Sequence, residues 1–155
     1  MEEKANNTVT ENVQPKSDLS TKIFIATKLT ELVLAIFSIG LIVDPFRHMR
    51  ETDVNHAGLT YVAYSGCIVA NCIFLLARLA REQQPLRVML LFTLVHGVLL
   101  IAAGGVVLAD WVRFRTRIVL LQPKQYMDMM VASGVMAIFN GVTHFIDIAL
   151  TIKFS

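Results

Sequence analysis

The stretch that decides the fold is MMVASGVMAIFNGVTHFIDIALTI, residues 129–152. A helix rises by ~1.5 Å per residue, so this stretch is long enough to cross the ~30 Å hydrocarbon core of a bilayer. It also carries Asn140, His144 and Asp147, which are spaced four and three residues apart. That spacing stacks their side chains on one face of a helix. Because polar groups in a membrane helix turn away from lipid, the face predicts other membrane helices that cover it.

Three further apolar runs supply those helices. The chain has 155 residues, of which 55% are hydrophobic, and its mean hydropathy of +0.59 exceeds that of an ordinary soluble domain. We therefore predict an all-α fold, a four-helix transmembrane bundle with both termini on the same side. The polar, aperiodic residues 1–19 are predicted to form a disordered N-terminal tail. The predicted transmembrane domain covers residues 20–155, with helices at 22–43, 59–79, 86–109 and 129–152.

The connection after the third predicted helix allows two interpretations. Residues 111–118 read WVRFRTRI, and the alternation places Arg113, Arg115 and Arg117 on one side of an extended chain. Such a period of two favours a strand or short hairpin. The other interpretation continues the third helix along the lipid headgroups, with Trp111 as an interfacial anchor. In either case the arginine row is typical of a solvated face or a headgroup contact.

Several functional classes have no signature in the chain. We find no glycine-rich phosphate loop, no zinc-type Cys/His spacing and no nucleophile elbow. The net charge of +2 is small and scattered, so it predicts no nucleic-acid surface. Cys67 and Cys72 are interpreted as reduced, buried, small apolar residues. We therefore expect no enzyme activity, no cofactor, no metal site and no nucleic-acid partner.

Two ionisable residues of the first helix mirror two of the last. Lys28 and Asp147 lie at matching distances from the helix ends, at roughly 8 Å from the same membrane face. Glu31 and His144 lie one turn deeper. An unpaired charge at depth costs on the order of 2–3 kcal/mol. The sequence therefore predicts that these helices are antiparallel neighbours, with Lys28 facing Asp147 and Glu31 facing His144.

Other candidate residues concern contacts between the remaining helices. Asn71 and His96 lie at mid-depth in the second and third helices, and we predict a hydrogen bond between them. Gly104, Gly105 and Gly141 are predicted packing positions, because glycine allows helix backbones to approach closely. The residues predicted for intramembrane polar pairing are Lys28, Glu31, Asn71, His96, Asn140, His144 and Asp147. They are interpreted as polar contacts that hold the bundle together or, alternatively, as a proton or ion path through Glu31, His144 and Asp147.

Two segments carry a resemblance to known families. Four spans, short loops and a first helix reading KLTELVLAIFSIGLI, residues 28–42, resemble the MARVEL-type four-span membrane proteins. The run IAAGGVVLADW, followed by GVMAIFNGVTHFIDIAL, is similar to the insect snakeskin-type proteins of smooth septate junctions. In that group a Gly-Gly and a Trp close the third helix, and an Asn-Gly followed by an Asp marks the fourth. The matching residues here are Gly104, Gly105, Trp111, Asn140, Gly141 and Asp147.

The resemblance implies cytoplasmic termini and a non-enzymatic part in organising cell junctions at the plasma membrane. A charge count leans the same way, with seven Lys and Arg on the side of the termini against six on the other. The expected partners are membrane lipids and other membrane proteins, a second copy of this chain among them. Two alternatives stay open: a small channel or transporter subunit that uses the polar stripe, and a lipid- or vesicle-trafficking four-span protein.

Overall fold

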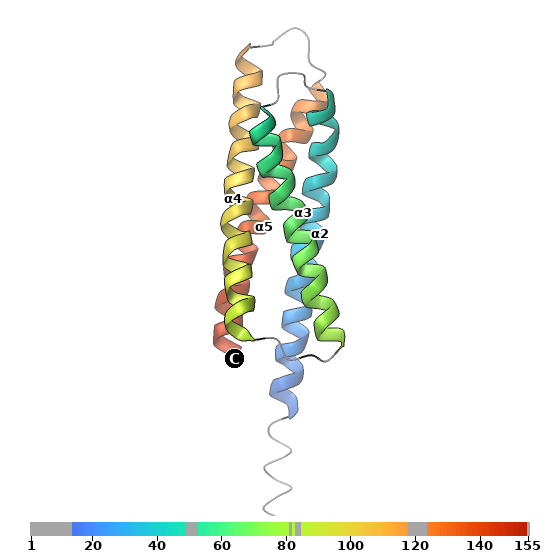
Figure 1. Ribbon diagram of the computed structural model, residues 1–155, viewed down its shortest axis with the longest axis vertical. Coiled ribbons are helices and arrows are strands. Elements are labelled where there is room, and N and C mark those ends of the chain that lie inside the picture. Colours follow the sequence, from blue (N-terminus) through green and yellow to red (C-terminus); the bar gives the residue numbers. More distant parts are fainter. Residues whose placement is uncertain (1–13, 49–52, 81, 83–84, 118–123, 155) are drawn as a thin grey trace, which may run out of the picture.

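The computed structural model shows a bundle of four long antiparallel helices (Figure 1). It describes residues 14–48, 53–80, 82, 85–117 and 124–154. The helices are α2 (Gln14–His48), α3 (Val54–Leu79), α4 (Leu86–Arg117) and α5 (Lys124–Phe154), and those described residues contain no strand. Helix α2 begins and α5 ends at the same end of the bundle (Figure 1). The prediction of an all-α, four-helix fold is confirmed.

The helices follow one another around the bundle in chain order. Helix α3 packs against α2 and α4, and α5 packs against α4 and α2, so that the first and last helices are neighbours. The contact between α4 and α5 is the most extensive. Each helix contains a span that is long and apolar enough to cross a membrane. At ~1.5 Å per residue the 35 residues of α2 extend over about 52 Å, so its ends project beyond the hydrocarbon core.

Helix α2 is longer than predicted at both ends. It begins at Gln14, so residues 14–19 are helical and the prediction that they belong to a disordered tail is wrong. Residues 1–13 lie outside the described part of the chain. At the other end the helix continues past Asp44, where we expected it to stop, and includes Pro45. Proline removes one backbone donor but tolerates helix on its C-terminal side.

Ring contacts account for the additional turn after Pro45. The ring of Phe46 meets that of Tyr61 on α3 edge to face, with centroids 5.8 Å apart. The ring of His48 stacks on Tyr126 of α5 at 5.1 Å. Both contacts form only if α2 stays helical to its last turn, so tertiary packing overrides the local stop signal.

The other helix ends also differ from the predicted ones. Helix α3 begins at Val54, because the Asp53 side chain accepts a hydrogen bond of 2.8 Å from the Asn55 backbone nitrogen and caps the helix. Helix α5 begins at Lys124, ahead of the predicted residue 129. Helix α4 continues to Arg117, so the strand interpretation of this segment is wrong and the third helix extends through it. Ile118 lies outside the described residues.

The helical course of α4 breaks up the expected arginine row. Residues two apart on a helix differ in direction by about 200°, so Arg113 and Arg115 diverge, although both are exposed. The Arg115 guanidinium carbon lies 5.4 Å from the centre of the Trp111 ring, one turn earlier. Phe114, between them, is buried against the bundle. The alternation in the sequence therefore reflects a buried Phe114 between two exposed arginines on a helix.

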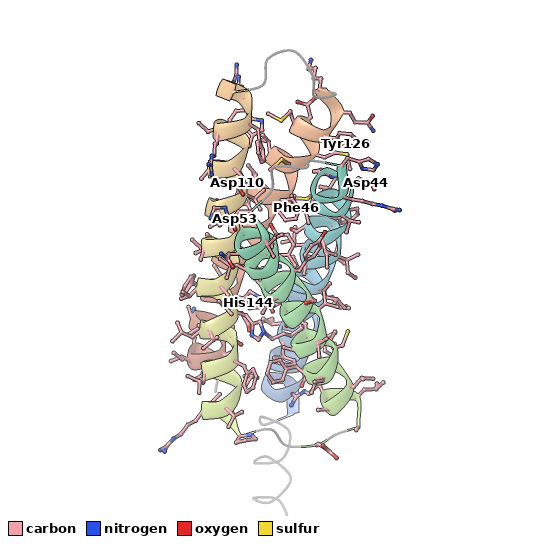
Figure 2. All side chains as sticks on the ribbon, turned by 45° about the horizontal axis from the view of Figure 1, so that its top comes forward. Asp44, Phe46, Asp53, Asp110, Tyr126 and His144 are labelled. Atoms are coloured by element: carbon pink, nitrogen blue, oxygen red, sulfur yellow. The ribbon has the colours of Figure 1, made fainter. Side chains whose placement is uncertain are left out.

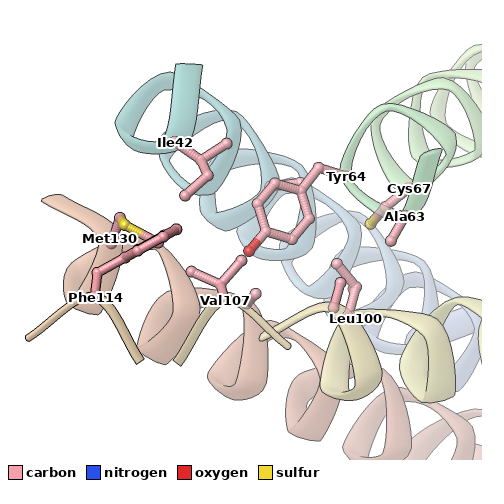
Figure 3. Close-up of a cluster of buried hydrophobic side chains, with 11 residues drawn as sticks. Ile42, Ala63, Tyr64, Cys67, Leu100, Val107, Phe114 and Met130 are labelled. Carbon is pink, nitrogen blue, oxygen red and sulfur yellow. The ribbon is translucent and has the colours of Figure 1, made fainter. Parts of the chain in front are cut away.

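The interior differs along the length of the bundle. Toward the end away from the termini it is filled by an apolar core, of which we define the central part as the apolar layer: Ile42, Tyr64, Leu100, Val107 and Met130 (Figure 3). Nearer the termini the interior is polar. The outer surface is apolar on all four helices, with Phe37, Ile73, Leu91 and Phe139 each more than half exposed. That surface suits lipid, while the polar groups are inside.

Candidate functional site

A buried group of polar side chains occupies the half of the bundle nearer the termini, and we call it the polar cluster. Helix α2 contributes two charged residues, α3 a thiol and an amide, α4 a hydroxyl, and α5 the stripe that the sequence indicated. Its members are Lys28, Glu31, Cys67, Asn71, Thr93, Asn140, His144 and Asp147, and all are at most 2% exposed. Figure 2 shows His144 inside the bundle, away from the end that carries Asp44 and Asp53.

Lys28 joins the two carboxylates of the polar cluster. Its Nζ atom lies 2.8 Å from Glu31 Oε2, one turn along the same helix, and 2.8 Å from Asp147 Oδ2 on α5. The ammonium also lies 3.4 Å from the Thr93 hydroxyl and 5.5 Å from the centre of the Phe74 ring. The predicted contact between Lys28 and Asp147 is therefore present in the structure.

Glu31 and His144 also approach each other as predicted. Glu31 Oε1 lies 3.1 Å from His144 Nδ1, and His144 Nε2 lies 3.3 Å from Cys67 Sγ. The first approach is close but does not have the geometry of a hydrogen bond donated by the imidazole. Among the described residues, three buried side-chain atoms have no hydrogen-bond partner: Glu31 Oε1, Asn140 Oδ1 and His144 Nδ1. All three belong to the polar cluster, where an unsatisfied polar atom costs about 1–3 kcal/mol.

The amide groups connect the helices less directly. Asn140 Nδ2 donates to the backbone carbonyl of Glu31 at 3.0 Å, so α5 holds α2 by its main chain as well as by its charges. Asn71 donates to Cys67 Sγ at 3.5 Å on its own helix. His96 Nδ1 lies 2.8 Å from the Phe92 carbonyl oxygen, one turn earlier. The predicted bond between Asn71 and His96 is absent, because each side chain finds a partner four residues back.

Glycines shape the contact between α4 and α5, but not all of the predicted ones. A Cβ atom at Gly104 would lie 2.7 Å from the Gly134 carbonyl oxygen, and one at Gly141 would lie 2.9 Å from that of Gly97. Two glycines seven residues apart on each antiparallel helix thus face each other, and we call this the glycine seam. A Cβ atom at Gly105 would have nothing within 4 Å, so its predicted packing role is wrong within the chain.

Gly97 and Gly134 were missed by the sequence reasoning. The signal was available, because the seven-residue spacing of Gly97 and Gly104 repeats in Gly134 and Gly141. Two turns of helix separate the members of each pair, so both fall on one face. A Gly-Gly dipeptide attracted attention to Gly105, whereas only one of two adjacent residues can face the neighbouring helix.

A second polar contact lies at the other end of the bundle. His56 Nδ1 lies 3.0 Å from both carboxylate oxygens of Asp110, joining the start of α3 to α4. The His56 side chain is 37% exposed and that of Asp110 is 4% exposed. The apolar layer separates this rim pair from the polar cluster. Sequence reasoning missed the pair because a loop histidine gives no sign of which helix it will meet.

The chemistry open to the polar cluster is electrostatic. Within the described residues, no group of three or more His, Cys, Asp and Glu side chains is arranged to hold a metal ion. What the geometry offers is an ammonium shared by two carboxylates and an imidazole beside one of them. Such a group can fix the helices against one another, and it can hold or release a proton.

The fold and this interior together define an integral, multi-pass membrane protein. Four apolar spans carry their lipid-facing side chains outward and their ionisable ones inward. Comparisons with models of protein families, with curated proteins and with solved structures find no match. The contacts within the chain are therefore the basis for assigning a function.

Proposed function

We propose that this protein is a non-enzymatic membrane protein that organises cell junctions or membrane domains by lateral association with lipids and other membrane proteins. The observation that carries the proposal is the distribution of polarity. Charged side chains of the polar cluster contact one another, and the apolar layer closes the interior beyond them. Charges arranged in this way stabilise a bundle and leave its apolar exterior for neighbours in the membrane.

The proposed location is the plasma membrane at a septate-type junction, with both termini in the cytoplasm. The support is the motif resemblance of α4 and α5, in which Gly104, Gly141 and Asp147 take part. In the structure these residues belong to the glycine seam and the polar cluster. The motif therefore coincides with the contacts that fix the α4–α5 pair against α2, which is what a scaffold requires.

Localisation in a polarised epithelium tests this proposal. We expect the tagged full-length protein to concentrate in a continuous belt at cell–cell contacts, and its depletion to break the belt formed by other junction proteins. A tag at either terminus should be protected from antibody until the plasma membrane is permeabilised. Accumulation in intracellular vesicles, with intact junctions after depletion, would instead support the trafficking alternative.

A transport role is the second candidate, because Glu31 Oε1 and His144 Nδ1 lack hydrogen-bond partners. Proteoliposomes with an imposed pH gradient discriminate the two. We expect proton flux equal to that of protein-free vesicles, since the apolar layer interrupts the polar interior. Flux above that level, lost on Asp147→Asn and retained on Ser133→Ala, would overturn the structural role in favour of conduction.

A further inference from the structure

The charges of the polar cluster do not balance. Glu31 and Asp147 bring two carboxylates to a single ammonium, that of Lys28, and all three side chains are at most 3% exposed. With a neutral His144 the cluster would carry one net negative charge inside the bundle. A buried charge without a counterion is costly, several kcal/mol even after relaxation of the protein. The interior therefore requires one additional positive charge.

The unpartnered atoms indicate where that charge belongs. Lys28 and Asp147 form a complete ion pair, whereas Glu31 Oε1 faces His144 Nδ1 at 3.1 Å. His144 Nε2 is directed at Cys67 Sγ, 3.3 Å away, and can donate a proton to that sulfur. In this tautomer Nδ1 carries a lone pair and faces a carboxylate oxygen, so two acceptors meet without a proton between them.

A proton fits this place better than a metal cation. A sodium or calcium ion takes several oxygen ligands, and the unpartnered oxygens here are Glu31 Oε1 and Asn140 Oδ1. The Lys28 ammonium, bound to the same carboxylate, would repel a metal ion. One proton on Glu31 supplies the missing charge and gives His144 Nδ1 a donor.

We propose that the polar cluster binds one exchangeable proton at neutral pH, on Glu31 Oε1 and donated to His144 Nδ1. The interior then holds one ion pair, Lys28 with Asp147, and one neutral carboxyl–imidazole hydrogen bond. Loss of the proton leaves a net negative charge at the contact of α2 with α5 and loosens it. The packing of these two helices is therefore coupled to pH, whichever function the protein serves.

Every helix presents groups to this proton. Helix α2 contributes Lys28, and α5 contributes Asp147 and the uncharged Asn140. Helix α3 brings the Cys67 thiol and the Asn71 amide. From α4 the His96 ring lies 6.4 Å from that of His144, and the Thr93 hydroxyl contacts the ammonium. The balance therefore depends on two carboxyl groups and one ammonium, with two imidazoles and a thiol near them.

Proton counting by equilibrium unfolding tests the proposal. The full-length protein in mild detergent micelles is unfolded with increasing fractions of a denaturing detergent, followed by the fluorescence of its single tryptophan, Trp111. Between about pH 7 and 8 a free carboxyl is ionised and a free imidazole mostly neutral. If the folded state retains one proton that the unfolded state has lost, stability falls as pH rises, and the unfolding constant increases about tenfold per pH unit.

Two variants separate this proton from other titrating groups. Glu31→Gln keeps the shape of the side chain but cannot bind or release this proton. We therefore expect the tenfold increase of the unfolding constant per pH unit to disappear in this variant. Ser133→Ala removes a buried hydroxyl that lies outside the cluster, beside Tyr64 of the apolar layer, and should keep the wild-type slope. A wild-type slope close to zero, or equal slopes in wild type and Glu31→Gln, would overturn the proposal.

Infrared spectroscopy of the folded protein gives a test that needs no unfolding. At about pH 8 a free glutamate is ionised, so a protonated carboxyl band in the folded wild type would mark a retained proton. We expect this band to be present in the wild type and in Ser133→Ala, and to disappear on raising the pH further. Its absence in the folded wild type would overturn the proposal whether or not Glu31→Gln folds.

Discussion

The two halves of the bundle interior are held together by different forces. In the half nearer the termini, the Lys28 ammonium lies 2.8 Å from a side-chain oxygen of Glu31 and 2.8 Å from one of Asp147. In the other half the apolar layer fills most of the space by close packing. Lipid chains are as apolar as a leucine side chain, so burial from lipid gives packed apolar groups little gain. Charged contacts therefore select which helices pair, while close packing fixes how the paired helices fit.

The largest expected effect comes from removing the ammonium of the polar half. Lys28→Met leaves the buried Asp147 carboxylate without its cation and should lower the free energy of unfolding by about 3–5 kcal/mol. Unfolding by denaturing detergent in micelles measures it. Lys124→Met, at an exposed lysine on α5, is the matched control and should change little. If the Lys28→Met protein is as stable as its control, charged contacts do not hold the half nearer the termini together.

The glycine seam should give the next largest effect. Gly104→Ala places a Cβ atom 2.7 Å from the Gly134 carbonyl oxygen and forces α4 and α5 apart. Overpacking of this kind costs about 1–3 kcal/mol. Gly105→Ala, at the adjacent residue, meets nothing within 4 Å and should leave stability unchanged or raise it slightly. Equal losses at both positions in the same unfolding assay would contradict the geometry of the seam.

The rim pair should matter less than the internal one. His56 is 37% exposed, so water screens its contact with Asp110 and can replace it in part. We expect His56→Ala to cost roughly 0.5–1 kcal/mol, as partly exposed pairs do. A loss as large as that of Lys28→Met would show that exposure is a poor guide to the worth of these contacts.

The smallest effect is expected from a neutral hydrogen bond at the edge of the apolar layer. Ser133 donates to the Ser38 carbonyl oxygen at 2.7 Å. Such bonds between membrane helices average ~0.6 kcal/mol, because the separated helices also find partners. Ser133→Ala should therefore lower the unfolding free energy by about that amount. A cost above that of Gly104→Ala would place neutral polar contacts among the dominant forces.

The pairing of α2 with α5 could be predicted because the sequence alone gives the depth of a side chain in the membrane and the helix face on which it lies. Lys28 and Asp147 lie at equal depth on amphipathic faces, and those two facts were enough to bring them together. The contact between Asn71 and His96 satisfied the same depth rule and yet failed. Depth fixes the level of a side chain but not its rotamer, and a carbonyl or sulfur four residues back competed successfully.

The helix ends were harder to predict because they depend on contacts between distant residues. Pro45 indicated a stop, but Phe46 and His48 continue α2 through rings on α3 and α5. The Asp53 cap was readable in the sequence and was overlooked. The alternation around Arg113 and Arg115 is also compatible with a helix. Over three residues, a helix at the edge of the bundle can alternate between exposed and buried side chains, as Arg113, Phe114 and Arg115 do. So short a pattern does not distinguish a strand from a helix.

The contact of Lys28 with its own helix has a consequence for biosynthesis. Asp147 lies on α5, which emerges from the ribosome after α2, so Lys28 enters the translocon long before its second partner exists. Glu31, one turn away and 2.8 Å from the ammonium, already neutralises it. Helix α2 can therefore enter the bilayer without an unpaired charge at this depth. When α5 arrives, the Asp147 carboxylate contacts an ammonium that already has a partner, and α5 packs between α4 and α2.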